Sequence, residues 1–97
     1  MKVIDDALLA EFRNRARCEF CQRPCRTGLD PHHLMARGRG SAFRMDLRIN
    51  LAALCRLCHR RVHAGEISQA ELLAVVAKRE GRDVNEMEEE LRRMRWK

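Results

Sequence analysis

Two C-x2-C pairs, Cys18/Cys21 and Cys55/Cys58, constrain this chain more than any other feature of its sequence. The spacing is typical of zinc ligation, and four thiolates complete a tetrahedral zinc site without leaving a position for water. A chain of 97 residues buries too small a share of its surface to be stable through apolar packing alone, so a metal staple is expected. The sequence therefore predicts a structural zinc site.

The expected compartment favours zinc over disulfides. Residues 1–10 include two aspartates and do not resemble a secretory signal. No apolar stretch is long enough for a membrane span, so we expect a cytoplasmic protein that has no membrane contact. Paired cysteines in such a reducing compartment are more often metal ligands than disulfides, which are the alternative. The fifth cysteine, Cys25, is expected to be a small buried residue rather than a ligand.

Charge is distributed unevenly along the chain, whose formal net charge is +6. Between Arg13 and Arg61 there are twelve arginines and three acidic residues, whereas Glu66 to Lys97 contains eight acidic and seven basic residues. Arginine clustered in this way suits contacts to phosphate, so nucleic acid is the expected partner. The alternative is ordinary solubility charge, which would be expected to intersperse the two signs.

Apolar periodicity, caps and turn residues predict a small α+β fold. Helices are expected from Asp5 to about Ala16, from the second cysteine pair to about Ala64, from Ser68 to about Glu80, and after Asp83. Short strands are expected at 29–35 and 48–54, with a glycine-rich loop at 37–41 between them. The last helix carries an apolar stripe of Val84, Met87, Leu91 and Met94. We expect this stripe to pack on the preceding helix, with contact to a partner or to DNA as the alternative.

The four histidines all fall within or just after the segment between the cysteine pairs, at His32, His33, His59 and His63. His59 and His63 are four residues apart on a predicted helix, so both imidazoles project from one face as a pair of metal ligands. Either histidine pair alone is weak evidence, because solvated surface histidines are common. The combination with Asn50 and with both cysteine pairs is specific.

The run Asp30-Pro-His-His-Leu34, followed by Asn50-Leu51, Leu54-Cys-Arg-Leu-Cys-His59 and His63, resembles the zinc-containing branch of the HNH nucleases. The resemblance covers roughly Arg17 to Gly65. It implies a ββα-metal core, in which a two-stranded hairpin and a helix grip one catalytic metal. It also implies one nuclease domain over 1–97, with an N-terminal helix at 1–17, the zinc and ββα-metal core at 18–65 and a helical extension at 66–97.

Carried onto this sequence, the resemblance implies that His33 is the general base and that His32 is a ligand of the catalytic metal. Asn50 would orient His33 through the loop, and His59 and His63 would supply ligands from the helix. Many relatives have aspartate where His32 stands. The histidine-rich site therefore leaves Mg²⁺, Mn²⁺, Ni²⁺, Co²⁺ and Zn²⁺ open as the catalytic divalent metal.

The implied activity is hydrolysis of phosphodiester bonds in DNA, by nicking or by double-strand cutting. An imidazole can take a proton from water, and a metal stabilises the charge that develops on the phosphate. Arginines of the connecting segment are expected to hold backbone phosphates, with solvated surface arginines as the alternative. They are Arg37, Arg39, Arg44 and Arg48.

Two alternative functions share most of these features. One is a non-catalytic zinc-finger module that binds DNA, which would not require the histidines and Asn50 at these positions. The other is a nuclease subunit that acts within a larger phage complex, since free-standing HNH proteins of this size resemble phage-encoded ones. The C-terminal helices leave open whether the chain forms a homodimer.

Overall fold

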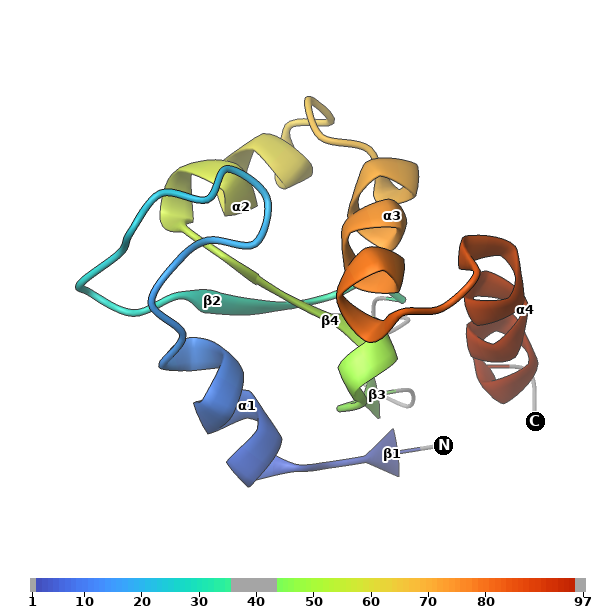
Figure 1. Ribbon diagram of the computed structural model, residues 1–97. Coiled ribbons are helices and arrows are strands. Elements are labelled where there is room, and N and C mark those ends of the chain that lie inside the picture. Colours follow the sequence, from blue (N-terminus) through green and yellow to red (C-terminus); the bar gives the residue numbers. More distant parts are fainter. Residues whose placement is uncertain (1, 36–43, 96–97) are drawn as a thin grey trace.

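The antiparallel pairing of β2 (Asp30–His33) with β4 (Leu51–Leu54) lies at the centre of the computed structural model, which describes residues 2–35 and 44–95 (Figure 1). The register places Asp30 opposite Leu54 and His33 opposite Leu51. All four residues of β4 are buried, because α1, α2 and α3 pack around this strand. The two predicted strands are confirmed, although both are shorter than expected. The second begins only after a 3-10 turn, η2 (Arg48–Asn50).

Four α-helices surround this pair in the part of the chain that the structure describes, so the small α+β fold is confirmed. They are α1 (Asp6–Arg13), α2 (Arg56–His63), α3 (Gln69–Glu80) and α4 (Val84–Arg95). Side-chain caps begin two of them: Asp5 accepts from the Leu8 N–H, and Ser68 and Glu71 form the capping box that the sequence predicts. Gly65 and Gly81 follow α2 and α3 with positive φ angles of 79° and 65°, the conformation that ends helices.

The first helix ends three residues earlier than predicted. Residues beyond Arg13 leave the helix because their backbone groups bond to the segment that follows the first cysteine pair. Arg17 forms a β-bridge with Pro24, and the Cys25 N–H donates to the Ala16 carbonyl at 3.0 Å. Helix formation over these residues would break both contacts.

A second, parallel pair joins β1 (Lys2–Val3) to β3 (Arg44–Met45). It was not predicted, since strands of two residues are too short to show a period of two. The Asp46 N–H continues the pairing by donating to the Val3 carbonyl at 2.8 Å. This pairing holds the N-terminal segment beside the residues that lead into η2.

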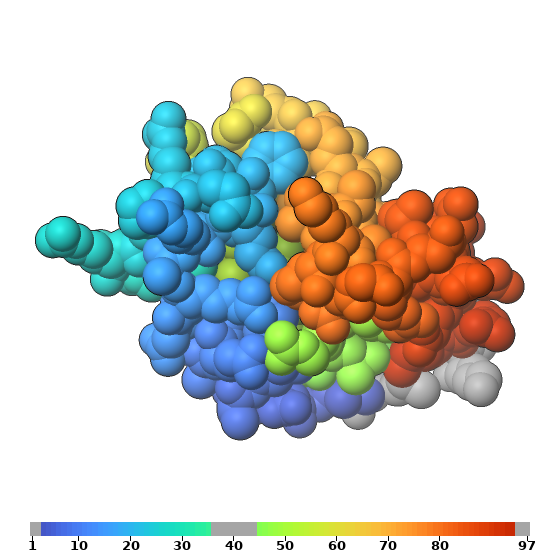
Figure 2. Space-filling model, in the orientation of Figure 1, coloured from blue at the N-terminus to red at the C-terminus, as the bar shows by residue number. Residues whose placement is uncertain are grey.

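Helix α3 packs on β4, α4 packs on α3 and η2, and the two helices form the right-hand side of the space-filling view (Figure 2). Met87 and Leu91 of α4 are fully buried, and Val84 and Met94 pack against the same core. The expected packing of this stripe on α3 is confirmed. Within residues 2–35 and 44–95, no helix is long and apolar enough to cross a membrane.

Candidate metal centre and histidine cleft

The four paired cysteines converge at one place, as their spacing predicted. Among residues 2–35 and 44–95 they form the one group of three or more metal-ligating side chains whose ligand atoms all lie within 4.8 Å of one another. Sγ of Cys21 and Sγ of Cys55 are 3.9 Å apart, close to the roughly 3.8 Å between two sulfurs on one tetrahedral zinc ion. This cluster could hold a metal ion such as zinc.

Local backbone geometry brings each cysteine pair into place. In the first pair, the Gln22 N–H donates to the Cys18 carbonyl at 2.9 Å, and Gln22 adopts a left-handed φ of 64°. In the second, Cys55 caps α2 and its Sγ accepts from the Cys58 N–H at 3.4 Å. The cluster therefore lies where the loop after α1 meets the start of α2.

The thiols of the cluster differ in acidity. Burial opposes ionisation of Cys18, but hydrogen bonds from the backbone N–H groups of Cys21 and Cys55 outweigh it and lower the Cys18 pKa to about 7. Burial raises the pKa of Cys58. Cys18 therefore forms a thiolate, the form that binds metal, more readily than Cys58.

Cys25 lies outside the cluster. Its Sγ donates to the Gly28 carbonyl at 3.1 Å, and the residue is half-buried rather than fully buried as predicted. It is not a member of the four-cysteine group. All five cysteines are free thiols, so no disulfide links the described residues.

Three imidazoles gather between β2 and α2. The ring centroids of His32 and His59 are 5.3 Å apart, those of His59 and His63 are 4.7 Å apart, and those of His32 and His63 are 6.2 Å apart. The Nε2 atoms of His59 and His63 face each other at 3.2 Å. One turn of helix and one strand thus bring together residues that are about thirty positions apart in sequence.

Two features of these imidazoles would suit metal binding. Nδ1 of His59 lies 3.1 Å from Oδ2 of Asp30, which leaves its Nε2 for other partners. Burial lowers the pKa of His32 to about 4, and electrostatic repulsion from the neighbouring His59 and His63 contributes to this decrease. His32 is therefore neutral at pH 7, which is the form in which imidazole binds metals.

His33, the next residue of β2, contacts a different partner. Its Nε2 lies 2.7 Å from Oδ1 of Asp46, whose side chain is fully buried. The other oxygen, Oδ2, accepts the Asp5 N–H at 2.9 Å. A carboxylate can only accept, so in the neutral imidazole of His33 the proton lies on Nε2 and the lone pair on Nδ1.

Asn50 is fully buried and makes no hydrogen bond to His33 among the described residues. Its Oδ1 accepts the Met35 N–H at 2.7 Å, and its Nδ2 donates to the Met45 carbonyl at 2.9 Å. Met35 and Met45 stand on either side of segment 36–43. Asn50 therefore links the backbone of Met35 to that of Met45, and its expected effect on His33 would be transmitted through β2.

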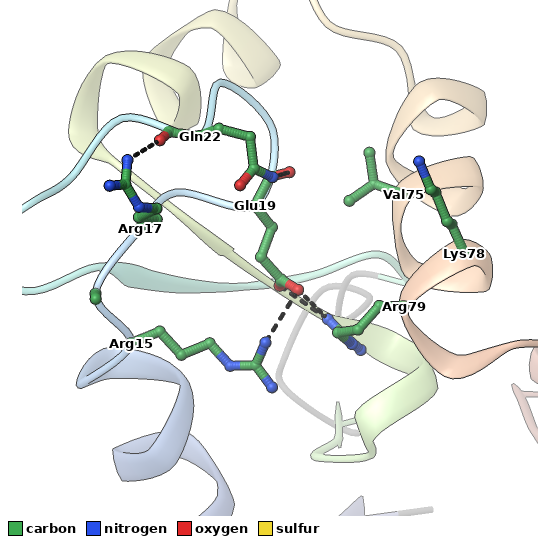
Figure 3. Close-up of a pocket in the computed structure, with 8 residues that line it drawn as sticks. Arg15, Arg17, Glu19, Gln22, Val75, Lys78 and Arg79 are labelled. Carbon is green, nitrogen blue, oxygen red and sulfur yellow. Dashed lines mark hydrogen bonds and ion pairs between the residues drawn. The ribbon is translucent and has the colours of Figure 1, made fainter.

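A cleft of about 300 Å³ opens at the histidines, between β2, α2 and the start of α3. Its lining includes His32, His33 and His63, together with Val62 and Gln69. A larger cleft of about 660 Å³ lies elsewhere, where the first cysteine pair meets α3 (Figures 2 and 3).

The larger cleft contains a structural ion-pair network. Glu19 accepts from Arg79 at 2.7 and 2.8 Å and from Arg15 at 3.2 Å (Figure 3). It also accepts from the Ala53 N–H at 2.7 Å. Its carboxylate is thus fully engaged in tying the first cysteine pair to β4 and α3. The smaller histidine cleft is the better candidate for chemistry.

Of the four arginines expected to bind phosphate, the structure describes the side chain of one. Arg37 and Arg39 lie outside the described residues, and of Arg44 only the backbone, in β3, is described. Arg48 pairs with Glu11 at 2.7 Å and with Glu80 at 3.7 Å. Its guanidinium also lies 5.6 Å from the centre of the Phe12 ring, so Arg48 links α1 to α3.

Sequence reasoning assigned no role to three acidic residues of these sites. Asp30 and Asp46 each contact a histidine, and Glu19 braces the first cysteine pair. The sequence does contain a signal for Asp30, because it stands two residues before His32. Asp46 carries no such signal, since thirteen positions separate it from His33.

Comparisons with known proteins leave the family open. No family model matches this chain, and neither the curated proteins nor the solved structures contain a match to it. Function is therefore inferred from the geometry of the site.

Proposed function

We propose that this protein is a metal-dependent DNA endonuclease with a ββα-metal active site of the HNH type, in which His33 is the general base. One observation carries the proposal: the antiparallel pair β2–β4, followed directly by α2, brings His33 beside a cluster of three imidazoles at the edge of a cleft. DNA, rather than RNA, follows from the resemblance of the motif to HNH nucleases.

The geometry of one histidine pair, His59 and His63, suits one divalent ion. Two nitrogens that each lie about 2.0–2.1 Å from one ion, at angles between octahedral and tetrahedral, are about 2.8–3.4 Å apart. The Nε2 atoms of His59 and His63 lie 3.2 Å apart, within that range. Asp30 holds His59 through Nδ1, the usual arrangement of a carboxylate behind a metal-binding imidazole. His32 would approach from β2 to complete the ligand set when the metal binds, since the ligand atoms of the three histidines do not all lie within 4.8 Å of one another.

The chain's own residues account for activation of water. Asp46 fixes the His33 proton on Nε2, so Nδ1 is the atom that takes a proton from the attacking water. Asn50 acts as a positioning residue by bracing the chain next to β2. A bound metal would supply charge stabilisation at the phosphate and at the departing 3′ oxygen.

Plasmid cleavage tests the proposal. Zinc-loaded protein would be incubated with supercoiled plasmid and with Mg²⁺, Mn²⁺, Ni²⁺, Co²⁺ or Zn²⁺ added singly. We expect cleavage with at least one metal, and a loss of about 100-fold or more in His33→Ala, since a general base contributes about 10²–10⁴. Gln69→Ala is the matched control, because Gln69 lines the same cleft without a titratable group.

Two results would contradict the proposal. Full activity in His33→Ala would remove the general base from it. Absence of cleavage with every metal, in wild-type protein that retains its zinc and binds DNA, would favour a non-catalytic zinc-finger module. The ratio of open-circle to linear product would separate nicking from double-strand cutting.

A further inference from the structure

Some arginine side chains pair with acids, while others form no ion pair within the described residues, among them Arg13, Arg23 and Arg26 as well as two on α2. Those that pair with acids hold the molecule together: Arg15, Arg48, Arg79, Arg82 and Arg92. Arg56 and Arg60 of α2 are exposed and form no ion pair within the part of the chain that the structure describes. These two charges therefore contribute nothing visible to internal packing.

The position of Arg56 also runs against the stability of its helix. An acidic residue stands in the first turn of α1, α3 and α4, where it complements the positive end of the helix dipole. The first turn of α2 contains no acid and begins with Arg56 instead. A cation at this end is unfavourable for an isolated helix. The helix dipole therefore gives no reason for an arginine at this position.

Helical geometry places this charge next to the histidine cleft. Arg56 and Arg60 are one turn apart and form a row, as do His59 and His63. At 3.6 residues per turn, the two rows are about 60° apart around the helix axis. Long guanidinium side chains in the first row therefore flank the imidazoles of the second.

We propose that Arg56 and Arg60 hold the DNA backbone by binding phosphates adjacent to the one that is cut. The inference rests on the proposed function. It assigns the phosphate contacts to Arg56 and Arg60 of α2 in place of the segment that contains Arg48. Guanidinium groups suit this role because they donate two parallel hydrogen bonds to a phosphate. The contact carries charge and orientation without base specificity.

A binding experiment in uncleaved DNA tests this inference. The His33→Ala protein, loaded with zinc, would be titrated into a short fluorescein-labelled duplex over a range of NaCl concentrations, with anisotropy as the readout. We expect Arg56→Ala/Arg60→Ala to weaken DNA binding about tenfold. The negative slope of log K against log salt should become shallower by about 1.8, since each lost phosphate contact accounts for about 0.9. Arg56→Lys/Arg60→Lys should retain most of the slope.

Arg82→Ala/Arg92→Ala is the matched control, because both of these arginines pair with acids of α4, at Glu90 and Glu88. It removes the same charge and should leave the salt slope unchanged. Equal losses in the two double variants would overturn the inference, as would unchanged binding in Arg56→Ala/Arg60→Ala. So would loss of zinc from that variant, since the arginines would then serve to neutralise the thiolate cluster.

The two proposals fail separately in these measurements. Binding that is insensitive to Arg56 and Arg60 leaves cleavage by the wild-type protein untouched. Cleavage that is insensitive to His33→Ala leaves the arginine contacts to DNA untouched.

Discussion

At the scale of single residues, the contact between His33 and Asp46 gives a spectroscopic prediction. Because the buried carboxylate accepts from Nε2 at 2.7 Å, ¹⁵N spectra of the imidazole should show a protonated Nε2 and an unprotonated Nδ1. Asp46→Asn should mix the two tautomers and reduce kcat by about 100-fold with little change in KM, the loss typical of an orienting group. In a His33→Ala background the same substitution should cost nothing more, and an additive loss would contradict the pairing.

The site residues differ in how far sequence predicted them. The four cysteines were predicted because a C-x2-C pair is a local pattern that folding brings to one ion. The approach of His59 to His63 was likewise predicted from helical spacing, and the structure places both beside His32. Asp46 could not be predicted, since its contact with His33 depends on the pairing of β1 with β3, which has no sequence period.

At the scale of elements, Arg79 connects three parts of the fold. Its guanidinium donates to Glu19 near the first cysteine pair, to the Leu51 carbonyl of β4 and to the Arg48 carbonyl of η2. Arg79→Ala should lower the free energy of unfolding by about 2–3 kcal/mol, because it leaves Glu19 buried with a weaker partner. Urea denaturation of the zinc-loaded protein measures this. Lys78→Ala, its exposed neighbour in Figure 3, should change stability by less than about 0.5 kcal/mol, and equal effects would contradict the role.

Elements were predicted best where local chemistry decides them. The capping box at Ser68 and the glycines after α2 and α3 depend on neighbouring residues alone, and the structure confirms the helices that they bound. The end of α1 and the late start of β4 were predicted less well. Both depend on distant partners, namely the bridge between Arg17 and Pro24 and the hydrogen bonds of Asn50.

At the scale of the whole molecule, the cysteine cluster is expected to determine whether the chain folds. It joins the loop after α1 to the start of α2, and through these to the central strands. A domain of this size is stable by about 5–15 kcal/mol, whereas structural zinc contributes apparent binding energies of about 10–16 kcal/mol. Removal of zinc by a chelator should therefore unfold the β2–β4–α2 region, seen as loss of amide dispersion in NMR spectra.

Single cysteine variants test whether folding depends on the cluster itself or on any one of the thiols. Cys58→Ser should bind less than one zinc per chain and lack a cooperative thermal transition, because a serine hydroxyl does not replace a thiolate ligand. Cys25→Ser is the matched control: its thiol bonds only to Gly28 and Thr27 in the described residues, so zinc content and transition should persist. Zinc content is measured by mass spectrometry in both variants and compared with their thermal transitions. Full zinc and a native transition in Cys58→Ser would show that the cluster is dispensable for folding.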